Sequence, residues 1–194
     1  MKNQELAERT KNSLINTARV QFTEKGYAET SLEEIVGKIN ITRGALYHHF
    51  GNKLGLFKAV VEVVQRGIAE SIEQESAKSE NSWEQLVLGC HAFVHAALLI
   101  ENRRILLVDG PAVLGWNEWS EIDEHHSESR LLQKITDLKA DGLIKDSISV
   151  KALTTVISGS LNEAVLWVSH AENPEQAKDE VLAVIDVMLN GFRK

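Results

Sequence analysis

The chain has 194 residues, of which 43% are hydrophobic and 25% are charged, and its formal net charge at pH 7 is −7. A chain of this composition can bury a core, which excludes an intrinsically disordered protein. Only 2 prolines and 12 glycines interrupt a sequence that is rich in leucine, isoleucine, alanine, glutamate and lysine. This composition predicts an all-α protein.

The sequence carries no signal for a membrane or an export pathway. The longest central stretch without Asp, Glu, Lys or Arg, Leu86 to Ile100, is shorter than the roughly 18 to 20 apolar residues that a membrane helix requires. The N-terminus lacks the apolar segment of a secretion signal, and the single cysteine, Cys90, has no internal disulfide partner. We therefore expect a cytoplasmic protein without a membrane partner.

Charge is distributed unevenly along the chain. Residues 1–60 carry a net charge of +3, and residues 61–194 carry a net charge of −10. A basic N-terminal region on an acidic remainder is typical of a protein that presents one end to a polyanion. The acidic remainder argues against a protein that coats DNA regardless of its sequence.

The N-terminal region contains the pattern of three helices. Apolar residues recur at intervals of three and four and stop at Gly26, which is typical of the residue after a helix end. Thr30 and Ser31 are followed by two glutamates in the spacing of a capping box, which predicts a short second helix. Asn40 tolerates a positive φ, so we expect a sharp turn before a third helix that begins after Thr42.

The third helix, Thr42 to Phe50, divides into two faces at 100° per residue. One face is apolar and predicts contact with the core. The other face presents a guanidinium, a position without a side chain, a phenol and an imidazole: Arg43, Gly44, Tyr47 and His48. Arginine can donate two hydrogen bonds to guanine, and the other groups can bind phosphate oxygens, so this face predicts DNA binding. Thr42 at the N-cap adds the exposed amides of the first turn.

The order and spacing of these elements resemble the N-terminal domain of TetR-family transcriptional regulators. The resemblance covers roughly residues 10–58 and is carried by the segments 22–27, 30–35, 41–50, 52–53 and 56–57. It implies a helix-turn-helix whose third helix enters the major groove, with base contacts from the face described above. It also implies contacts to the DNA backbone from Thr30, Ser31 and Lys53. Asn40 and Gly51 depart from the family pattern, which often has glycine and proline at these positions.

The remaining apolar stripes predict a helical bundle. We expect a long helix from Lys53 to about Ala77, and further helices at 83–100, 103–108, 119–140, 150–170 and 174–192. The short helix at 103–108 is predicted to end at Gly110-Pro111. The acidic residues between Glu118 and Glu128 are interpreted as the solvated side of their helix. We expect a DNA-binding domain over residues 1–52 and a ligand-binding and dimerisation domain over residues 53–194.

The last two helices carry more apolar surface than one interior contact needs. The resemblance implies that they form a four-helix interface in a homodimer, so that the protein reads a palindromic operator. The residues expected in this interface are Val156, Ile157, Leu161, Ala164, Val168, Val181, Val184, Ile185 and Met188.

A ligand pocket is expected inside the bundle, lined by side chains that combine apolar bulk with a polar tip. The candidates are Trp83, His91, His95, Trp116, Trp119, His125, His126, Asn162 and Trp167. For each tryptophan, a plain core position is the alternative. His91 and His95 share a helix face, a spacing that allows Zn²⁺ binding with His125 or His126. Because the chain has no cysteine cluster and no HExxH motif, we predict no metal and no other cofactor.

The sequence thus predicts a dimeric DNA-binding regulator, a repressor that a small-molecule effector releases from its operator. The alternative is an enzyme that acts on a small substrate in the bundle, with His91, His95 or the acidic residues as acid–base groups. That alternative lacks a nucleophile with a positioned base and a phosphate-binding loop, so we expect a protein that is not an enzyme.

Overall fold

The computed structural model describes residues 2–194, and side chains from residue 4 onward. The described chain is helical and contains no strand, apart from one isolated bridge between Ile144 and Arg193, so the predicted all-α class is confirmed. The elements are α1 (Lys2–Glu29), α2 (Leu32–Lys38), α3 (Arg43–Phe50), α4 (Lys53–Ser76), α5 (Ser82–Leu98), α6 (Ile100–Arg103), the π-helix η1 (Arg104–Asp109), α7 (Gly110–Leu114), α8 (Trp116–Asp123), the π-helix η2 (Glu124–Glu128), α9 (Ser129–Ala140), α10 (Val150–His170) and α11 (Pro174–Phe192).

Two compact units share the chain. Unit 1 comprises residues 1–64 and 100–120, and unit 2 comprises residues 65–99 and 121–194. The chain passes between the units within α4, at Leu99, and within α8. Unit 1 therefore includes a central segment as well as the N-terminal helices. The division into functional domains at residue 52 stays a prediction.

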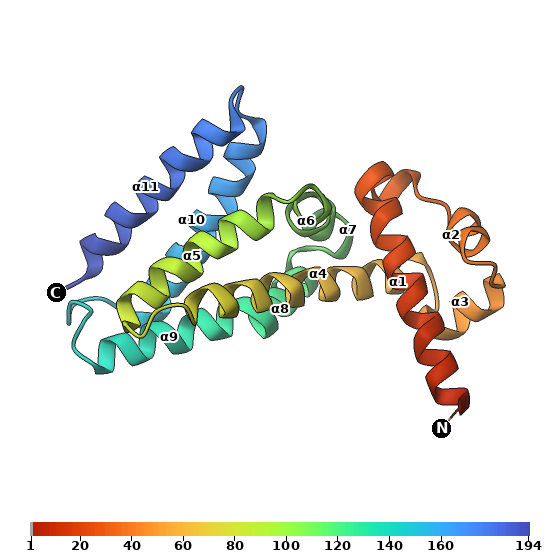
Figure 1. The fold of residues 1–194 in the computed structure, drawn as a ribbon, viewed down its shortest axis with the longest axis horizontal. Coiled ribbons are helices and arrows are strands. Elements are labelled where there is room, and N and C mark those ends of the chain that lie inside the picture. Colours follow the sequence, from red (N-terminus) through yellow and green to blue (C-terminus); the bar gives the residue numbers. More distant parts are fainter. Residues whose placement is uncertain (1) are drawn as a thin grey trace. The chain divides into compact units, whose positions relative to one another are not determined.

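The first three helices of unit 1 form as their local signals predict. α2 and α3 both pack on α1 (Figure 1). Ser31 caps α2 by accepting a hydrogen bond from the Glu33 amide, and Asn40 has the positive φ of 52° that the turn requires. Leu46, the buried residue of α3, is fully enclosed. These contacts fix α3 on the domain through one side.

The start of α4 completes the core of unit 1. Phe57 meets the Phe22 ring edge-on, with centroids 5.1 Å apart, and lies 5.0 Å from the Tyr27 ring. Gly51, which departs from the family pattern, has a φ of 73° at the C-cap of α3. Proline cannot adopt that angle, so the glycine here matches a sharp reversal between the two helices.

The end of α1 is held by the central segment of unit 1. Gly26 has a φ of 81° and interrupts the helical backbone, as the sequence predicts. Arg104 donates to the Lys25 carbonyl at 3.2 Å, and Asp109 accepts from the Tyr27 amide at 2.9 Å. A Cβ at Gly26 would lie 2.2 Å from the Arg104 guanidinium, so the guanidinium occupies the space that the glycine leaves open.

The central segment differs from its predicted form. The helix expected at 103–108 does not end at Gly110-Pro111, because α6, η1 and α7 follow one another without a break and Gly115, with a φ of 79°, ends the run. Pro111 lies in the first turn of α7, where its missing N–H removes no hydrogen bond. The expected helix at 119–140 is likewise longer and consists of α8, η2 and α9.

Unit 2 is built around α10. This helix packs against α5, α9 and α11 (Figure 1), with Leu153, Ile157, Leu161 and Val165 in the interior. The predicted bounds of α10 and α11 are confirmed, and Ser149 and Asn173 cap their N-termini. Among the described residues, no single helix is long and apolar enough to cross a bilayer; α5 reaches that length and hydropathy only when joined to the segment Ile100–Leu114 beyond Leu99, and the pair is bent there.

Candidate nucleic-acid interface and candidate ligand cavity

The polar face of α3 lies on the surface of unit 1. Thr42, Arg43, Gly44, Tyr47 and His48 are all exposed. The Thr42 hydroxyl accepts a hydrogen bond from the Ala45 amide at 3.2 Å, which fixes the start of the helix. A Cβ at Gly44 would meet nothing closer than the Thr42 hydroxyl at 3.7 Å, so the backbone of the first turn is open to a close approach.

Arg43 is oriented by neighbours on two helices. Its guanidinium forms an ion pair with the Glu33 carboxylate of α2 at 2.6 Å and donates to the Tyr47 hydroxyl at 3.1 Å. Hydrogen bonds from the Glu33 backbone and the Ser31 hydroxyl, together with the charge of Arg43, lower the pKa of Glu33. The hydrogen bond with Tyr47 and the charge of Glu33 raise the pKa of Arg43. The arginine is therefore charged and aligned along the exposed face of α3.

The residues expected on the DNA backbone differ in what they can reach. Thr30 is only 3% exposed, and its hydroxyl lies 2.7 Å from the Gly26 carbonyl and 3.2 Å from the Gln21 carbonyl. Its side chain is thus used inside unit 1, which corrects the expectation of a DNA contact from it. Ser31 is half-buried and serves the α2 cap.

Lys53, the other residue expected on the backbone, lies at the start of α4. Its ammonium donates to the Ala28 carbonyl at 3.1 Å and lies 4.6 Å from the centroid of the Tyr27 ring. An ammonium has three donors, so this arrangement leaves Lys53 able to donate to a phosphate as well.

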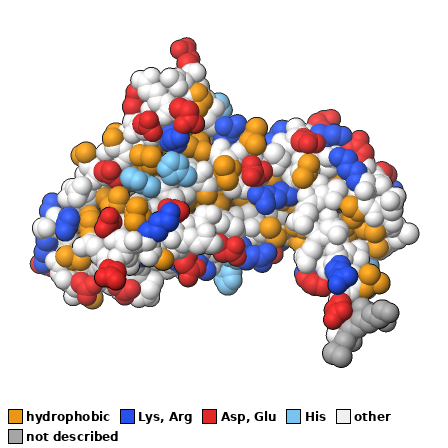
Figure 2. Space-filling model, viewed as in Figure 1, with side chains coloured by type: hydrophobic (Ala, Val, Ile, Leu, Met, Phe, Trp, Pro, Cys, Tyr) orange, Lys and Arg blue, Asp and Glu red, His pale blue; other side chains and the backbone are white. Residues whose placement is uncertain are grey.

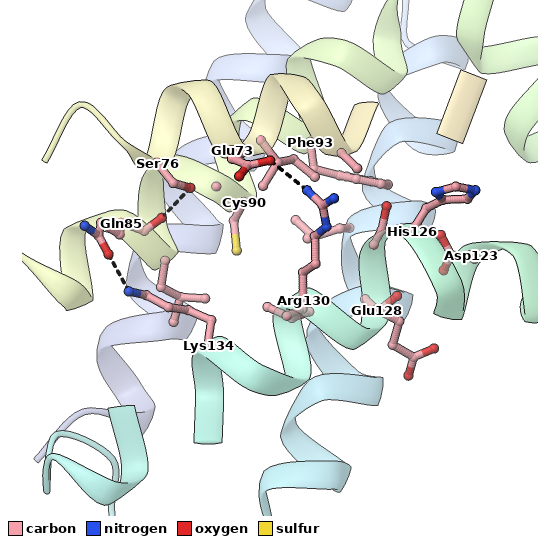
Figure 3. A pocket seen from close by; sticks show the side chains of 18 residues that line it. Glu73, Ser76, Gln85, Cys90, Phe93, Asp123, His126, Glu128, Arg130 and Lys134 are labelled. Atoms are coloured by element: carbon pink, nitrogen blue, oxygen red, sulfur yellow. Dashed lines mark hydrogen bonds and ion pairs between the residues drawn. The ribbon is translucent and has the colours of Figure 1, made fainter. Parts of the chain in front are cut away.

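Unit 2 contains a cavity of about 380 Å³. Its wall comes from α4, α5, the stretch from α8 to α9, and α10 (Figure 3). The lining residues are Ala69, Ile72, Glu73, Ser76, Gln85, Leu86, Gly89, Cys90, Phe93, Asp123, His126, Ser127, Glu128, Arg130, Leu131, Lys134, Ser158 and Leu161. The volume lies within the range of small-molecule sites, and much of the wall is apolar.

Ionisable side chains stand at both ends of this cavity. Lys134, Gln85 and Ser76 lie on one side, and Asp123 and His126 lie on the other, with Phe93 and Cys90 between them (Figure 3). Asp123 is 7% exposed, and burial raises its pKa to about 6, while the Gln65 amide opposes this shift by donating to the carboxylate at 3.0 Å. Burial also raises the pKa of the Cys90 thiol to about 12, so this sulfur stays protonated and is a poor nucleophile.

The expected pocket residues are mostly placed elsewhere. His126 lines the cavity, whereas Trp83, His91, His95, Trp116, Trp119, His125, Asn162 and Trp167 do not. Trp119 is buried in unit 1, where its indole donates to the Leu106 carbonyl at 2.7 Å. Trp116 and Trp167 are exposed, and Trp83 is buried with the Arg193 guanidinium 5.3 Å from its ring.

His91 and His95, the pair named for the alternatives of zinc binding and acid–base catalysis, do not line the cavity. The His91 imidazole is within 2.7 Å of the Asp186 carboxylate, and His95 is exposed. Over the part of the chain that the structure describes, no group of three or more His, Cys, Asp or Glu residues is arranged to hold a metal ion.

Sequence reasoning missed the charged residues of the cavity wall. Asp123 is expected on the solvated side of its helix, but it is buried and, with His126 three residues later, lines the cavity. The three-residue spacing to His126, which is predicted for the pocket, is the available signal for Asp123. Lys134 and Arg130, four residues apart on α9, had no comparable signal, because lysine and arginine at such spacing usually lie in solvent.

The residues expected in a dimer interface fall on two faces. One face is buried in the core of unit 2 and comprises Ile157, Leu161, Val168 and Ile185. Val156 and Val184 are exposed, and Ala164, Val181 and Met188 are half-buried. Val187, which has no predicted role, and Trp167, which is predicted only for the pocket, are exposed at 75% and 52%. Hydrophobic side chains are visible on the surface along α11 in Figure 2.

Comparison with known proteins agrees with this architecture. Residues 14–60 match the family model of bacterial regulatory proteins of the tetR family, and residues 83–192 match the tetracyclin repressor-like C-terminal domain. The Transposon Tn10 TetC protein of Escherichia coli is 28% identical over 180 residues, which cover 91% of this chain and 87% of TetC. The biofilm operon negative transcriptional regulator IcaR of Staphylococcus aureus is 27% identical over 186 residues, with 92% and 98% covered.

A solved structure gives the same result over nearly the whole chain. A TetR-family transcriptional regulator from Pectobacterium atrosepticum is 35% identical, superposes with a TM-score of 0.82, and covers 97% of this chain and 96% of its own. The matched C-terminal model spans more than half of the chain, and the N-terminal model covers the helices that present the polar face of α3. The chain therefore belongs to the TetR family of DNA-binding transcriptional regulators.

Proposed function

We propose that the protein is a homodimeric repressor that binds a palindromic operator through its two α3 helices and is released when a small molecule binds in the cavity of unit 2. The single observation that carries the proposal is the exposed, oriented Arg43 on α3. The name of IcaR, a negative transcriptional regulator, supports repression as the outcome.

The α3 surface supports sequence-specific contact with DNA. An arginine held by neighbours at both sides keeps its planar group in one orientation, which favours two parallel hydrogen bonds to a guanine edge. The exposed Tyr47 and His48 add groups that bind phosphate, and the open backbone at Gly44 allows the helix to lie close to the groove.

Two exposed apolar helix faces support a dimer. Val156 on α10 is 52% exposed, and Val184 on α11 is 67% exposed. A Cβ added at Gly159 on α10 or at Gly191 on α11 would meet no atom of the described chain within 4 Å. A second pair of helices can therefore approach the backbone closely at these two glycines. Large apolar side chains grouped on neighbouring helices are typical of an interface that another copy covers.

A ligand-dependent release is supported by the cavity. A ligand that fits one conformation of the protein better than another shifts the population toward the first. If the distance between the two α3 helices in the favoured conformation differs from the distance between the two half-sites of the operator, the affinity for the operator falls.

The test begins with selection of bound fragments from random double-stranded DNA by the full-length protein. We expect a palindrome whose half-sites are separated by about one helical turn, 34 to 36 Å. Binding to that palindrome, to one half-site and to a scrambled sequence is then compared across salt concentrations. Equal affinity for the palindrome and the scrambled sequence would contradict the proposal.

A further inference from the structure

Two ionisable side chains of opposite charge, Lys134 and Asp123, line the cavity of unit 2 on opposite sides. The first is Lys134 of α9, whose ammonium donates to the Gln85 side-chain oxygen at 2.5 Å. Gln85 is neutral and is itself held in place, because its amide donates to the Ser79 carbonyl at 2.7 Å. The ion pairs formed by the described side chains include none to Lys134. A half-buried ammonium with a neutral partner has donors available for an anion.

The second group is Asp123 at the opposite side of the cavity. Its carboxylate accepts a hydrogen bond from Gln65, which is fully buried. The hydroxyl oxygen of Ser127, four residues after Asp123, is buried and has no hydrogen-bond partner within the described chain. Buried polar atoms are nearly always paired in folded proteins, so this end of the cavity has unused hydrogen-bonding capacity. Ser127 also lines the cavity and can both donate and accept.

Four other ionisable side chains line the cavity: Glu73, His126, Glu128 and Arg130. His126 and Glu128 lie near Asp123 in Figure 3. Arg130 forms an ion pair with Glu73 at 3.0 Å, and the two side chains are drawn joined in Figure 3. In Figure 3 this exposed ion pair is drawn between Lys134 and Asp123, beside Phe93 and Cys90. Leu86 and Leu161 are further apolar residues of the lining. The cavity thus combines polar groups at its two ends with apolar wall residues and an ion pair that is exposed to solvent.

We propose that the ligand of this cavity is an apolar carboxylic acid with a hydroxyl group at its far end, whose carboxylate binds Lys134 and whose hydroxyl binds Asp123 and Ser127. The inference rests on the proposed function, because it names the class of small molecule that the cavity accepts. A hydroxyl fits better than an ammonium at the Asp123 end, because it costs less to remove from water and can accept a hydrogen bond from Ser127 as well as donate one.

Calorimetry on the full-length protein without DNA tests this class directly. The probes are a series of ω-hydroxy fatty acids and 4-hydroxyphenyl-alkanoic acids of increasing length. Each is compared with its methyl ester, with the same acid lacking the hydroxyl, and with the ω-amino acid. We expect the best hydroxy acid to bind about tenfold more tightly than its ester, because the ester loses the charge-assisted hydrogen bond. We also expect it to bind several-fold more tightly than the other two analogues.

Variants assign the two ends of the ligand. Lys134→Gln should remove the preference for acid over ester, whereas Lys151→Gln, the same change at an exposed lysine at the start of α10, should retain it. Asp123→Leu should remove the preference for the hydroxyl. If Asp123→Leu does not fold, the comparison of the two acids on the natural protein still decides the role of that end.

Three results would overturn the inference. The first is that no hydroxy acid in the series binds at concentrations up to about 1 mM. The second is that the methyl esters or the ω-amino acids bind as well as the hydroxy acids, and the third is that Lys134→Gln leaves the preference for acid over ester intact. Operator binding is measured separately with the same compounds. An acid that binds as expected but leaves operator affinity unchanged would contradict ligand-dependent release and not the ligand class. If only the methyl esters or the ω-amino acids release the operator, the proposed ligand class is contradicted but ligand-dependent release is not.

Discussion

In the proposed complex with DNA, Arg43 is a binding side chain that its neighbours already hold in place. A flexible arginine loses rotamer freedom when it binds, and that loss reduces affinity. Here the Glu33 carboxylate and the Tyr47 hydroxyl already hold the guanidinium. All three side chains are exposed, so the ion pair adds little to folding stability. Its main effect is on the orientation of the arginine.

We expect Arg43→Ala to weaken binding to the selected operator by about 1 to 3 kcal/mol and to relax the preference at one base pair in each half-site. Titration of the full-length variant against operators with single substitutions measures both effects. Arg66→Ala, at an exposed arginine of α4 in unit 2, is the matched control and should leave affinity unchanged. An unaltered base preference in Arg43→Ala would show that this arginine does not read a base.

Asp123 makes folding stability depend on pH in an unusual direction. Burial raises its pKa from 3.8 to about 6, so between these values the folded chain holds a proton that the unfolded chain has released. The contribution of Asp123 to the free energy of unfolding therefore falls as pH rises, by about 2 to 3 kcal/mol across this range. The charge of Glu128 acts in the same direction as burial, and the Gln65 hydrogen bond acts against it.

Asp123→Asn removes this titration while keeping an acceptor for the Gln65 amide. We expect the stability advantage of the variant over the natural chain to be about 1 to 1.5 kcal/mol larger at about pH 7.5 than at about pH 5, because between these values the folded carboxyl loses its proton while the unfolded one is already ionised. Urea unfolding at the two pH values gives the comparison, with Asp179→Asn at an exposed position as the control. A stability difference that is the same at both pH values would rule out the raised pKa as its cause.

At the scale of elements, the joint between η1, α7 and α8 depends on a glycine. A Cβ at Gly110 would lie 2.7 Å from the Ile105 carbonyl oxygen and 2.8 Å from the Trp119 ring. That ring is fixed by its own hydrogen bond to the Leu106 carbonyl, so it cannot move away without losing a buried partner. The close packing at Gly110 explains how the helical run continues past a Gly-Pro pair.

Gly110→Ala should destabilise the protein by about 1 to 3 kcal/mol, because the added methyl group overpacks this joint. Gly37→Ala is the matched control: it lies inside α2 with open space around its Cβ position, and it should stabilise the protein by about 0.4 to 1 kcal/mol. Chemical unfolding of both variants measures these opposite signs. Equal effects from the two substitutions would contradict the packing argument.

Elements with strong local signals could be predicted from the sequence. The bounds of α10 and α11 follow from their caps and from Pro174 in a first turn, and the turn before α3 follows from Asn40. The π-helices could not be predicted, because Gly110-Pro111 is a common signal for a helix end and only tertiary packing shows that it continues. The cavity wall comes from segments far apart in the chain, which no local pattern brings together.

The apolar spacing predicts the helices α10 and α11, but it does not separate their buried apolar residues from their exposed ones. Ile185 is buried in unit 2 and its neighbour Val184 is 67% exposed, although both are β-branched and adjacent. A helix that is apolar over a wide arc can pack one face in the core of its own protomer and present a second face to another copy. Composition alone does not say which residues lie on which face. The exposed face, with Val184 and Val187, is the part that remains for a partner.

At the scale of the whole molecule, the proposed dimer gives the last prediction. Val184→Glu combined with Val187→Glu places two carboxylates on the exposed face of α11, where a second copy would bury them without a counter-ion. We expect this double variant to sediment as a monomer and to bind the palindrome about 100-fold more weakly than the natural protein, because the second half-site no longer benefits from a tethered partner. Its affinity for an isolated half-site should be nearly unchanged. Val108→Glu, at a valine that is 48% exposed in η1, is the control and should remain dimeric. A double variant that stays dimeric would show that α11 is not the interface, and a monomer with full affinity for the palindrome would show that the operator does not require two copies.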